Sequence, residues 1–184
     1  ADRQRQRNRR HALQQAAHAS PTVGDNLQHH IDFLTDQIAQ VKRAIQDHID
    51  DCPALNRYRD LLTSIQGIGP LTAAKLLGEY GDMRQFTDVR QVVAFAGLNP
   101  RHRQSGSSVR GHTPISKMGR SSIRATLYMP AVVAKRANPR LVALADRLAA
   151  RGLCQMEIVV AVMRKLLHFA FGVLKSGQPF RSSW

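Results

Sequence analysis

Apolar side chains recur along residues 27–55 at alternating steps of four and three residues. The positions in this series are Leu27, Ile31, Leu34, Ile38, Val41, Ile45, His48, Cys52 and Leu55. Such a repeat lines one narrow face of a long helix, as in a coiled coil, so we predict a coiled-coil helix over residues 23–56. This seam can pair with a second copy or fold back on its own domain. We expect pairing, and therefore a homo-oligomer formed through residues 27–55.

Residues 1–22 precede this helix and carry a different pattern. They are rich in arginine and glutamine and have no apolar face, and Ser20-Pro21 interrupts any helix that begins there. We therefore predict a basic arm or linker, either solvated or a frayed helix.

Residues 57–184 are predicted to form a compact helical domain, which makes the fold class all-α. No useful stretch alternates as a strand does, and an aromatic content of 5% favours aliphatic helix packing. We expect helices over residues 121–137 and 155–175, the second being the buried central helix, with His168 as a packed core histidine. Residues that mark the starts and stops of further helices are Thr87-Asp88, Gly97, Asn138-Pro139 and Gly152.

A glycine-rich turn joins two apolar helix segments between residues 57 and 81. Gly67 and Gly69 flank Ile68, and Pro70 opens the second helix, which carries Lys75. This pattern predicts a helix-hairpin-helix, in which the free amides at the start of the second helix bind a phosphate group. The alternative is an ordinary antiparallel helix pair joined by a short glycine turn.

The net positive charge lies entirely in the second half of the chain. The net charge is +14, yet residues 1–88 carry 11 basic and 11 acidic side chains, whereas 16 basic residues follow Asp88 against only Asp146 and Glu157. This asymmetry predicts a polyanionic partner, with nucleic acid as the default. A membrane surface is the competing polyanion.

Other features of the chain argue against a membrane. There is no run of about 18 apolar residues and no signal-peptide pattern at the amino terminus. Cys52 and Cys154 are too few and too scattered to suggest a disulfide framework or a zinc site. We therefore expect a cytoplasmic protein that has no metal site in this chain.

The basic segment 98–120 combines glycine and serine turns with cations that extend to Arg124. Its predicted phosphate contacts are Arg101, Arg103, Arg110, Lys117, Arg120 and Arg124. Ser105 lies in a Gln-Ser-Gly turn, where the following glycine leaves room for a phosphodiester. We predict a reactive hydroxyl beside a nucleic-acid backbone. The alternative is a solvated basic loop whose serines only cap turns.

Three stretches together resemble a known family. These are SIQGIGPLTAAKLL, VVAFAGLNPRHRQSGSSVRGHTPISKMGRSSIRATLY and MRKLL. They closely resemble the carboxy-terminal transposase domain of the insertion-sequence family called IS one-ten, also described as DEDD transposases and bridge-RNA-guided recombinases. The departures are mild, because Gln66 stands where the family often has proline and Asn99 where a small residue is common.

The resemblance implies a chemical role for Ser105. In the family, the serine of this turn attacks DNA and forms a covalent protein–DNA linkage, while a separate RuvC-like domain supplies four acidic residues that hold Mg²⁺. It also implies DNA and a guide (bridge) RNA as partners. No comparable acidic spacing occurs in this sequence, so we expect it to supply half of a composite site and to be inactive alone. Ser107, Ser108 and Tyr128 are the rival nucleophiles.

Two function classes remain open from the sequence. The first is a DNA transposase or recombinase module that supplies the serine nucleophile. The second is a non-enzymatic helix-hairpin-helix adaptor that binds DNA or structured RNA through its basic face. Ser105 separates them, because an adaptor would retain its function with alanine at that position.

Overall fold

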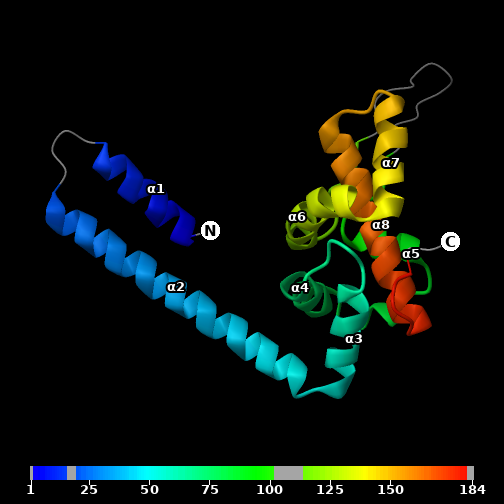
Figure 1. Ribbon diagram of the computed structural model, residues 1–184, viewed down its shortest axis with the longest axis horizontal. Helices are drawn as coiled ribbons and strands as arrows, with labels where there is room; N and C mark the ends of the chain where they lie inside the picture. The colour runs from blue at the N-terminus through cyan, green and yellow to red at the C-terminus, as the bar shows by residue number, and fades with distance from the viewer. Residues whose placement is uncertain (1, 16–19, 102–113, 182–184) are drawn as a thin grey trace. The chain divides into compact units, whose positions relative to one another are not determined.

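The computed structural model describes residues 2–15, 20–101 and 114–181, and almost all of its regular structure is helical. The chain divides into two units, Ala1–Asp51 and Cys52–Trp184 (Figure 1). Among the described residues the sole β-type pairing is an isolated bridge between Pro100 and Ile115. The predicted all-α fold class is therefore confirmed.

The first unit contains two helices that pack against each other, α1 (Asp2–Gln14) and α2 (Pro21–Asp50). Proline is favourable in the first turn of a helix, which explains why α2 starts at Pro21. The Arg10 side chain of α1 donates a hydrogen bond to Gln28 of α2. Most of the segment predicted as a basic arm is therefore a helix with a partner inside its own unit.

The long helix ends earlier than predicted. α2 stops at Asp50, and α3 (Pro53–Thr63) begins two residues after Asp51. Cys52 is extended, as the residue before a proline prefers to be, so the helix cannot continue to residue 56. The last seam position, Leu55, lies on α3 instead.

Part of the predicted seam remains exposed within the chain. Ile31 is buried, whereas Ile38, Val41 and Ile45 are 36%, 57% and 41% exposed. An apolar stripe on an otherwise polar helix is typical of a surface that pairs with another helix.

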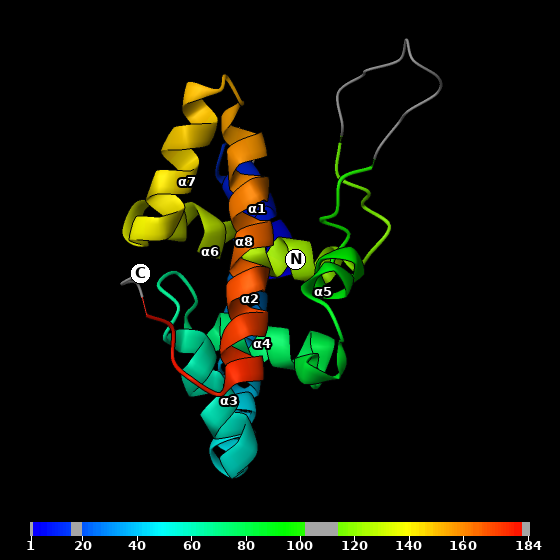
Figure 2. The same cartoon turned by 90° about the vertical axis from the view of Figure 1, so that its right-hand side faces the viewer.

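The second unit is built around one central helix. Its elements are α3, α4 (Pro70–Tyr80), the short 3₁₀ helix η1 (Met83–Gln85), α5 (Val89–Phe95), α6 (Ser121–Ala137), α7 (Pro139–Ala150) and α8 (Gln155–Ser176). α8 packs against α3, η1, α5, α6 and α7 (Figure 2). Ten of its side chains are buried, which confirms the predicted central helix. No helix in the described ranges is long and apolar enough to cross a membrane.

Local capping explains several helix boundaries. The side chain of Asp88 accepts a hydrogen bond from Arg90 N at 3.0 Å, and Asn138 caps α7 in the same way. Gly97 follows α5 with a φ of 68°, a conformation that favours glycine. These boundaries match the prediction. His168, by contrast, is only partly buried and is not a core residue.

Candidate nucleic-acid interface

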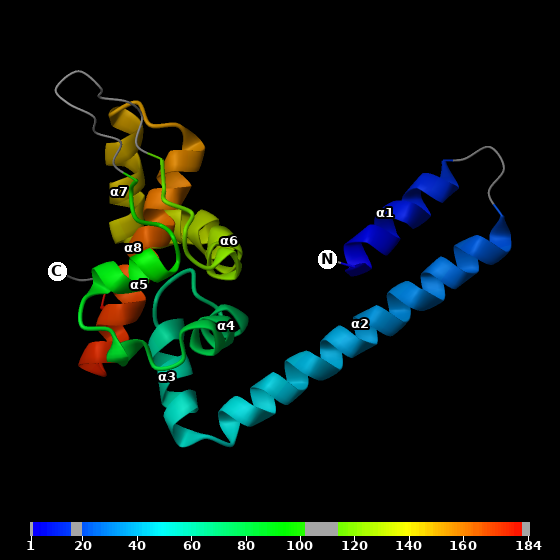
Figure 3. The same cartoon turned by 180° about the vertical axis from the view of Figure 1, so that it is seen from behind.

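The turn between α3 and α4 reaches α6 (Figure 3). Gly67 has a φ of 106°, and a Cβ added there would lie 2.5 Å from Ala134 Cβ and 3.0 Å from the Pro130 carbonyl oxygen. Ile68 is buried beside it. Gly67 is therefore required by close packing against α6 and by its left-handed backbone.

Gly69 has a different role. It is exposed at the N-cap of α4, and no atom lies within 4 Å of a Cβ added there. The first amides of a helix have no partner inside the helix, and Gly69 leaves space beside them for an anion. Lys75 is exposed further along α4. The geometry therefore suits the predicted phosphate contact at Gly69 and Lys75, which remains a prediction.

The two glycines should respond differently to substitution. Gly67→Ala is expected to reduce the free energy of unfolding by about 2 kcal/mol, because of the close contact and the left-handed backbone. Gly69→Ala should leave stability within about 0.5 kcal/mol. Urea denaturation followed by circular dichroism measures both. Equal destabilisation by the two variants would contradict this division of roles.

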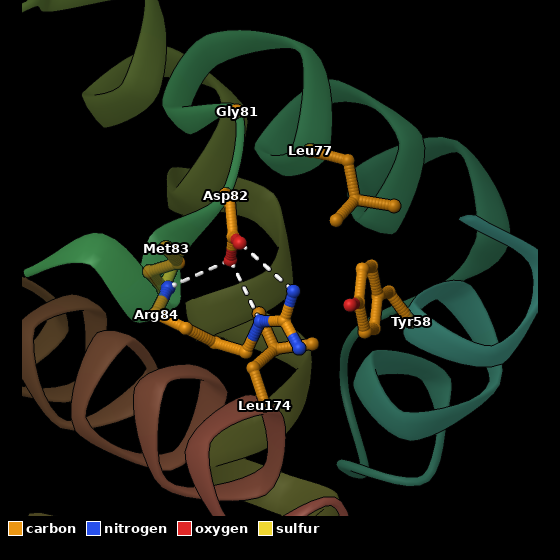
Figure 4. A pocket seen from close by; sticks show the side chains of 7 residues that line it. All are labelled: Tyr58, Leu77, Gly81, Asp82, Met83, Arg84 and Leu174. Carbon is orange, nitrogen blue, oxygen red and sulfur yellow. Dashed lines mark hydrogen bonds and ion pairs between the residues drawn. The ribbon is translucent and has the colours of Figure 1, made fainter. Parts of the chain in front are cut away.

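A small pocket beside the hairpin is lined by an ion pair (Figure 4). The Arg84 guanidinium donates two hydrogen bonds of 2.8 Å to Asp82 and lies 4.7 Å from the centre of the Tyr58 ring. The hydrogen bonds from Arg84 lower the pKa of the Asp82 carboxyl. Because its charge is already paired, Arg84 here joins α3 to η1 and is not a free anion-binding group.

The two ends of segment 102–113 lie side by side. Arg101 N donates a 2.8 Å hydrogen bond to the Pro114 carbonyl. Ser116 donates twice to Asn99, from N to the carbonyl oxygen at 2.8 Å and from Oγ to Oδ1 at 2.6 Å. We call residues 97–101 and 114–120 the loop base. It fixes where segment 102–113 leaves the helical unit and where it returns.

Two glycines bring the backbones of the loop base into contact. A Cβ on Gly119 would lie 2.2 Å from the Phe95 carbonyl oxygen and 2.3 Å from Gly97 N. A Cβ on Gly97 would lie 2.6 Å from Gly119 N. No side chain fits between these backbones, so the end of α5 and the segment before α6 are held together directly.

Arg120 links the loop base to α4. Its backbone N donates to the Phe95 carbonyl at 2.9 Å, and its guanidinium lies 5.0 Å from the Phe95 ring centre. Nη1 also donates to the carbonyl and carboxylate oxygens of Glu79, at 3.2 and 3.1 Å. Hydrogen bonds from Ser122 and from Arg120 lower the pKa of Glu79, so this carboxylate is charged at neutral pH.

Arg124 reinforces the same junction from α6. Its Nη1 donates to the carbonyl oxygens of Ala96 and Gly119, each at 2.9 Å. One guanidinium therefore joins the C-terminal end of α5 to the segment that precedes α6. This contact and the Arg120 contact were not anticipated from the sequence, because their partners lie far away in the chain or are backbone atoms.

Some of the other predicted site residues lie in the part of the chain that the structure describes, and some lie outside it. Arg101 and Lys117 are exposed on the loop base, and Lys117 has a φ of 55°. Ser105, Arg103 and Arg110 lie outside the described residues, as do the rival serines. Tyr128 is exposed on α6. DNA contact by these residues, and by Arg120 and Arg124, remains a prediction.

Side-chain clusters that hold metal ions in proteins are built from His, Cys, Asp or Glu. Nowhere in the described ranges do three or more His, Cys, Asp or Glu side chains gather in a way that could hold a metal ion.

Comparison with known proteins finds a family match within the helical unit that carries the loop base. Residues 59–145 match the family described as "Transposase IS116/IS110/IS902 family". Over these residues the chain matches this transposase family. The match begins on α3 and ends on α7, so it contains the hairpin, the loop base and segment 102–113. The resemblance found in the sequence is confirmed at the level of the family.

Individual relatives extend the similarity beyond residues 59–145. The pilin gene-inverting protein of Moraxella bovis is 33% identical over 177 residues, which is 96% of this chain and 53% of the relative. An uncharacterized 43.6 kDa protein of insertion element IS110 from Streptomyces coelicolor is 27% identical over 146 residues, 79% of this chain and 36% of the relative. The transposase for insertion sequence element IS1328 of Yersinia enterocolitica is 33% identical over 109 residues, 58% of this chain and 30% of the relative.

The matched relatives are longer than this chain. The chain spans about half the length of the pilin gene-inverting proteins that it matches. The rest of each relative lies outside the alignment, so the family match alone does not assign the activity of a whole transposase to this chain.

Proposed function

We propose that this chain is the DNA-binding and nucleophile-bearing part of a transposase or site-specific DNA recombinase. The observation that carries the proposal is the loop base, which holds both ends of the cationic Gln-Ser-Gly segment against the family-matched helical unit. A structural clamp of this kind positions a loop on a rigid scaffold, as a reactive group requires.

In the proposed reaction, Ser105 Oγ attacks the phosphorus of a phosphodiester. An Oγ–P bond forms as the bond from phosphorus to a deoxyribose oxygen breaks; the serine hydroxyl loses its proton, and the leaving oxygen takes one up. Attack by another deoxyribose hydroxyl on the linkage releases the serine and joins the strands in a new arrangement. Arg101, Arg103 and Arg110 would offset the negative charge that grows on the phosphoryl oxygens.

In this proposal, metal binding and the choice of DNA target depend on partners of the chain. A separate RuvC-like domain would hold Mg²⁺ through its acidic residues, and a guide RNA would select the DNA. Alone, the chain is then expected to bind DNA without cutting it. The non-enzymatic adaptor is the competing outcome and would show the same binding by the isolated chain.

DNA binding by the basic segment is tested by its salt dependence. The triple variant Arg101→Ala, Arg103→Ala, Arg110→Ala should bind duplex DNA more weakly, with a slope of log affinity against log salt that is smaller by about three, one unit per lost phosphate contact. Fluorescence anisotropy across a salt series measures the slope. An unchanged slope would remove the basic segment as the main DNA contact.

We also propose that the exposed seam of α2 pairs with a second copy of the chain. Ile38→Asp introduces a charge at this apolar position and is expected to convert a dimer or larger oligomer into a monomer while Cys52–Trp184 stays folded. Sedimentation velocity measures the oligomeric state, and circular dichroism measures the helical content. Wild-type chain that sediments as a monomer at tens of micromolar would refute the pairing.

A further inference from the structure

The central helix α8 carries a polar row among its many buried side chains. In this row lie Lys165, His168, Gly172 and Lys175, at successive steps of three, four and three residues. This spacing places them on one side of the helix. Lys165, Gly172 and Lys175 are exposed, and His168 between them is partly buried. We call these four residues the α8 stripe.

Among the residues that the structure describes, the cations of the stripe have no ion-pair partner. Neither Lys165 nor Lys175 forms an ion pair within the described ranges, and Arg164, beside the stripe, forms none there either. Lys165 Nζ lies 5.4 Å from the Phe169 ring centre. Lys175 Nζ donates to the Thr87 carbonyl at 3.3 Å, a neutral partner. The row therefore presents two lysine charges that form no ion pair with the described part of the chain.

The surroundings of His168 show the same crowding of positive charge. Burial lowers its pKa first, and the nearby Lys165 and Arg164 lower it further, whereas Asp88 opposes them. Asp88 uses its carboxylate to cap α5. An anion bound along the stripe would relieve the mutual repulsion of these groups.

Gly172 leaves the backbone of the stripe uncovered. It lies within the 22-residue α8, where glycine is less favourable than alanine, yet no atom lies within 4 Å of a Cβ added there. Packing inside the chain therefore does not require this glycine. Close approach of a ligand to the helix between two lysines would require it.

We propose that the α8 stripe binds the sugar–phosphate backbone of a nucleic acid. From Lys165 to Lys175 the helix rises about 15 Å, the axial length of about four successive phosphates on one strand. Two cations, a hydrogen-bonding imidazole and an open glycine suit such a strand. The surface lies outside the hairpin and outside residues 98–124. The inference rests on the proposed function only in taking nucleic acid as the partner.

The test compares two charge-matched double variants of the full chain. Lys165→Gln with Lys175→Gln removes two charges from the stripe, and Arg147→Gln with Arg151→Gln removes two exposed charges from the end of α7. Affinity for a DNA duplex and for an RNA duplex of the same sequence is measured across a salt series. We expect the stripe variant to reduce the salt slope by about two and the control to leave it within about 0.5.

A second substitution tests the uncovered backbone without changing charge. Gly172→Gln should weaken binding at least about fivefold while the melting temperature stays the same or rises, because glutamine favours helix. The control is Ala149→Gln on the exposed part of α7, which should change neither the binding affinity nor the melting temperature.

The outcomes separate this surface from the proposed function. If the stripe variant binds both duplexes more weakly, the stripe contacts the phosphate backbone that DNA and RNA share. If it binds only one duplex more weakly, the stripe contacts that nucleic acid. If wild type binds and the triple arginine variant loses affinity, while the stripe and α7 variants behave alike, this inference is wrong and the proposed function stands. If wild type binds neither duplex, both are wrong.

Discussion

In a protein that joins this chain to the proposed RuvC-like domain, Ser105→Ala is expected to reduce formation of a covalent DNA–protein adduct at least about 10³-fold. Strand exchange should fall in parallel, because both depend on the same nucleophile. Affinity for DNA should stay within about twofold, since one hydroxyl adds little to a surface dominated by cations. Denaturing gel electrophoresis measures the adduct, and anisotropy measures binding.

The neighbouring serines provide matched controls for this prediction. Ser107→Ala and Ser108→Ala remove the same group from the same segment and should leave the adduct intact. If the adduct persists in Ser105→Ala and disappears in one of the others, the nucleophile lies elsewhere in the segment. Full recombination in all three variants would rule out a covalent serine mechanism.

Gly119→Ala is expected to lower stability by about 3 kcal/mol, the second large effect. The added Cβ would lie 2.2 Å from the Phe95 carbonyl oxygen and 2.3 Å from Gly97 N. Both are backbone atoms, so the strain cannot be relieved by rotating a side chain. The melting temperature should fall by about 10 °C, measured by differential scanning calorimetry.

The control for this substitution is a glycine with open space. Gly78→Ala, on the exposed face of α4, meets no atom within 4 Å and should raise the melting temperature slightly, because alanine favours helix. If the Gly119→Ala variant has the same melting temperature as the wild type, the two backbones of the loop base are not in contact.

Local signals predicted most of the fold. Asp88 and Asn138 cap helices at the expected positions, because an N-cap side chain bonds to amides two or three residues away. α6 begins at Ser121 and ends at Ala137, as expected. The early end of α2 also has a local cause in Pro53. The heptad pattern continues to Leu55, which is why the sequence predicted a longer helix.

Long-range contacts could not be predicted in the same way. Arg120 and Glu79 are 41 residues apart, and no spacing rule links them. The sequence therefore identified Arg120 and Arg124 as cations suited to phosphate, without showing that both bond to the protein around the loop base. Similarly, the apolar character of α8 predicted its burial, whereas the exposure of its polar row is apparent only after its neighbours are in place.

The most direct test of the serine mechanism is to locate the DNA-linked residue by mass spectrometry. A protein that joins this chain to the proposed RuvC-like domain would be incubated with the proposed guide RNA, Mg²⁺ and a cleavable DNA. The adduct would then be digested with nuclease and protease, and the modified peptide sequenced. We predict a nucleotide attached through phosphorus to Ser105. Attachment to a residue outside segment 102–113, or efficient recombination with no attached nucleotide at any stage, would contradict the mechanism.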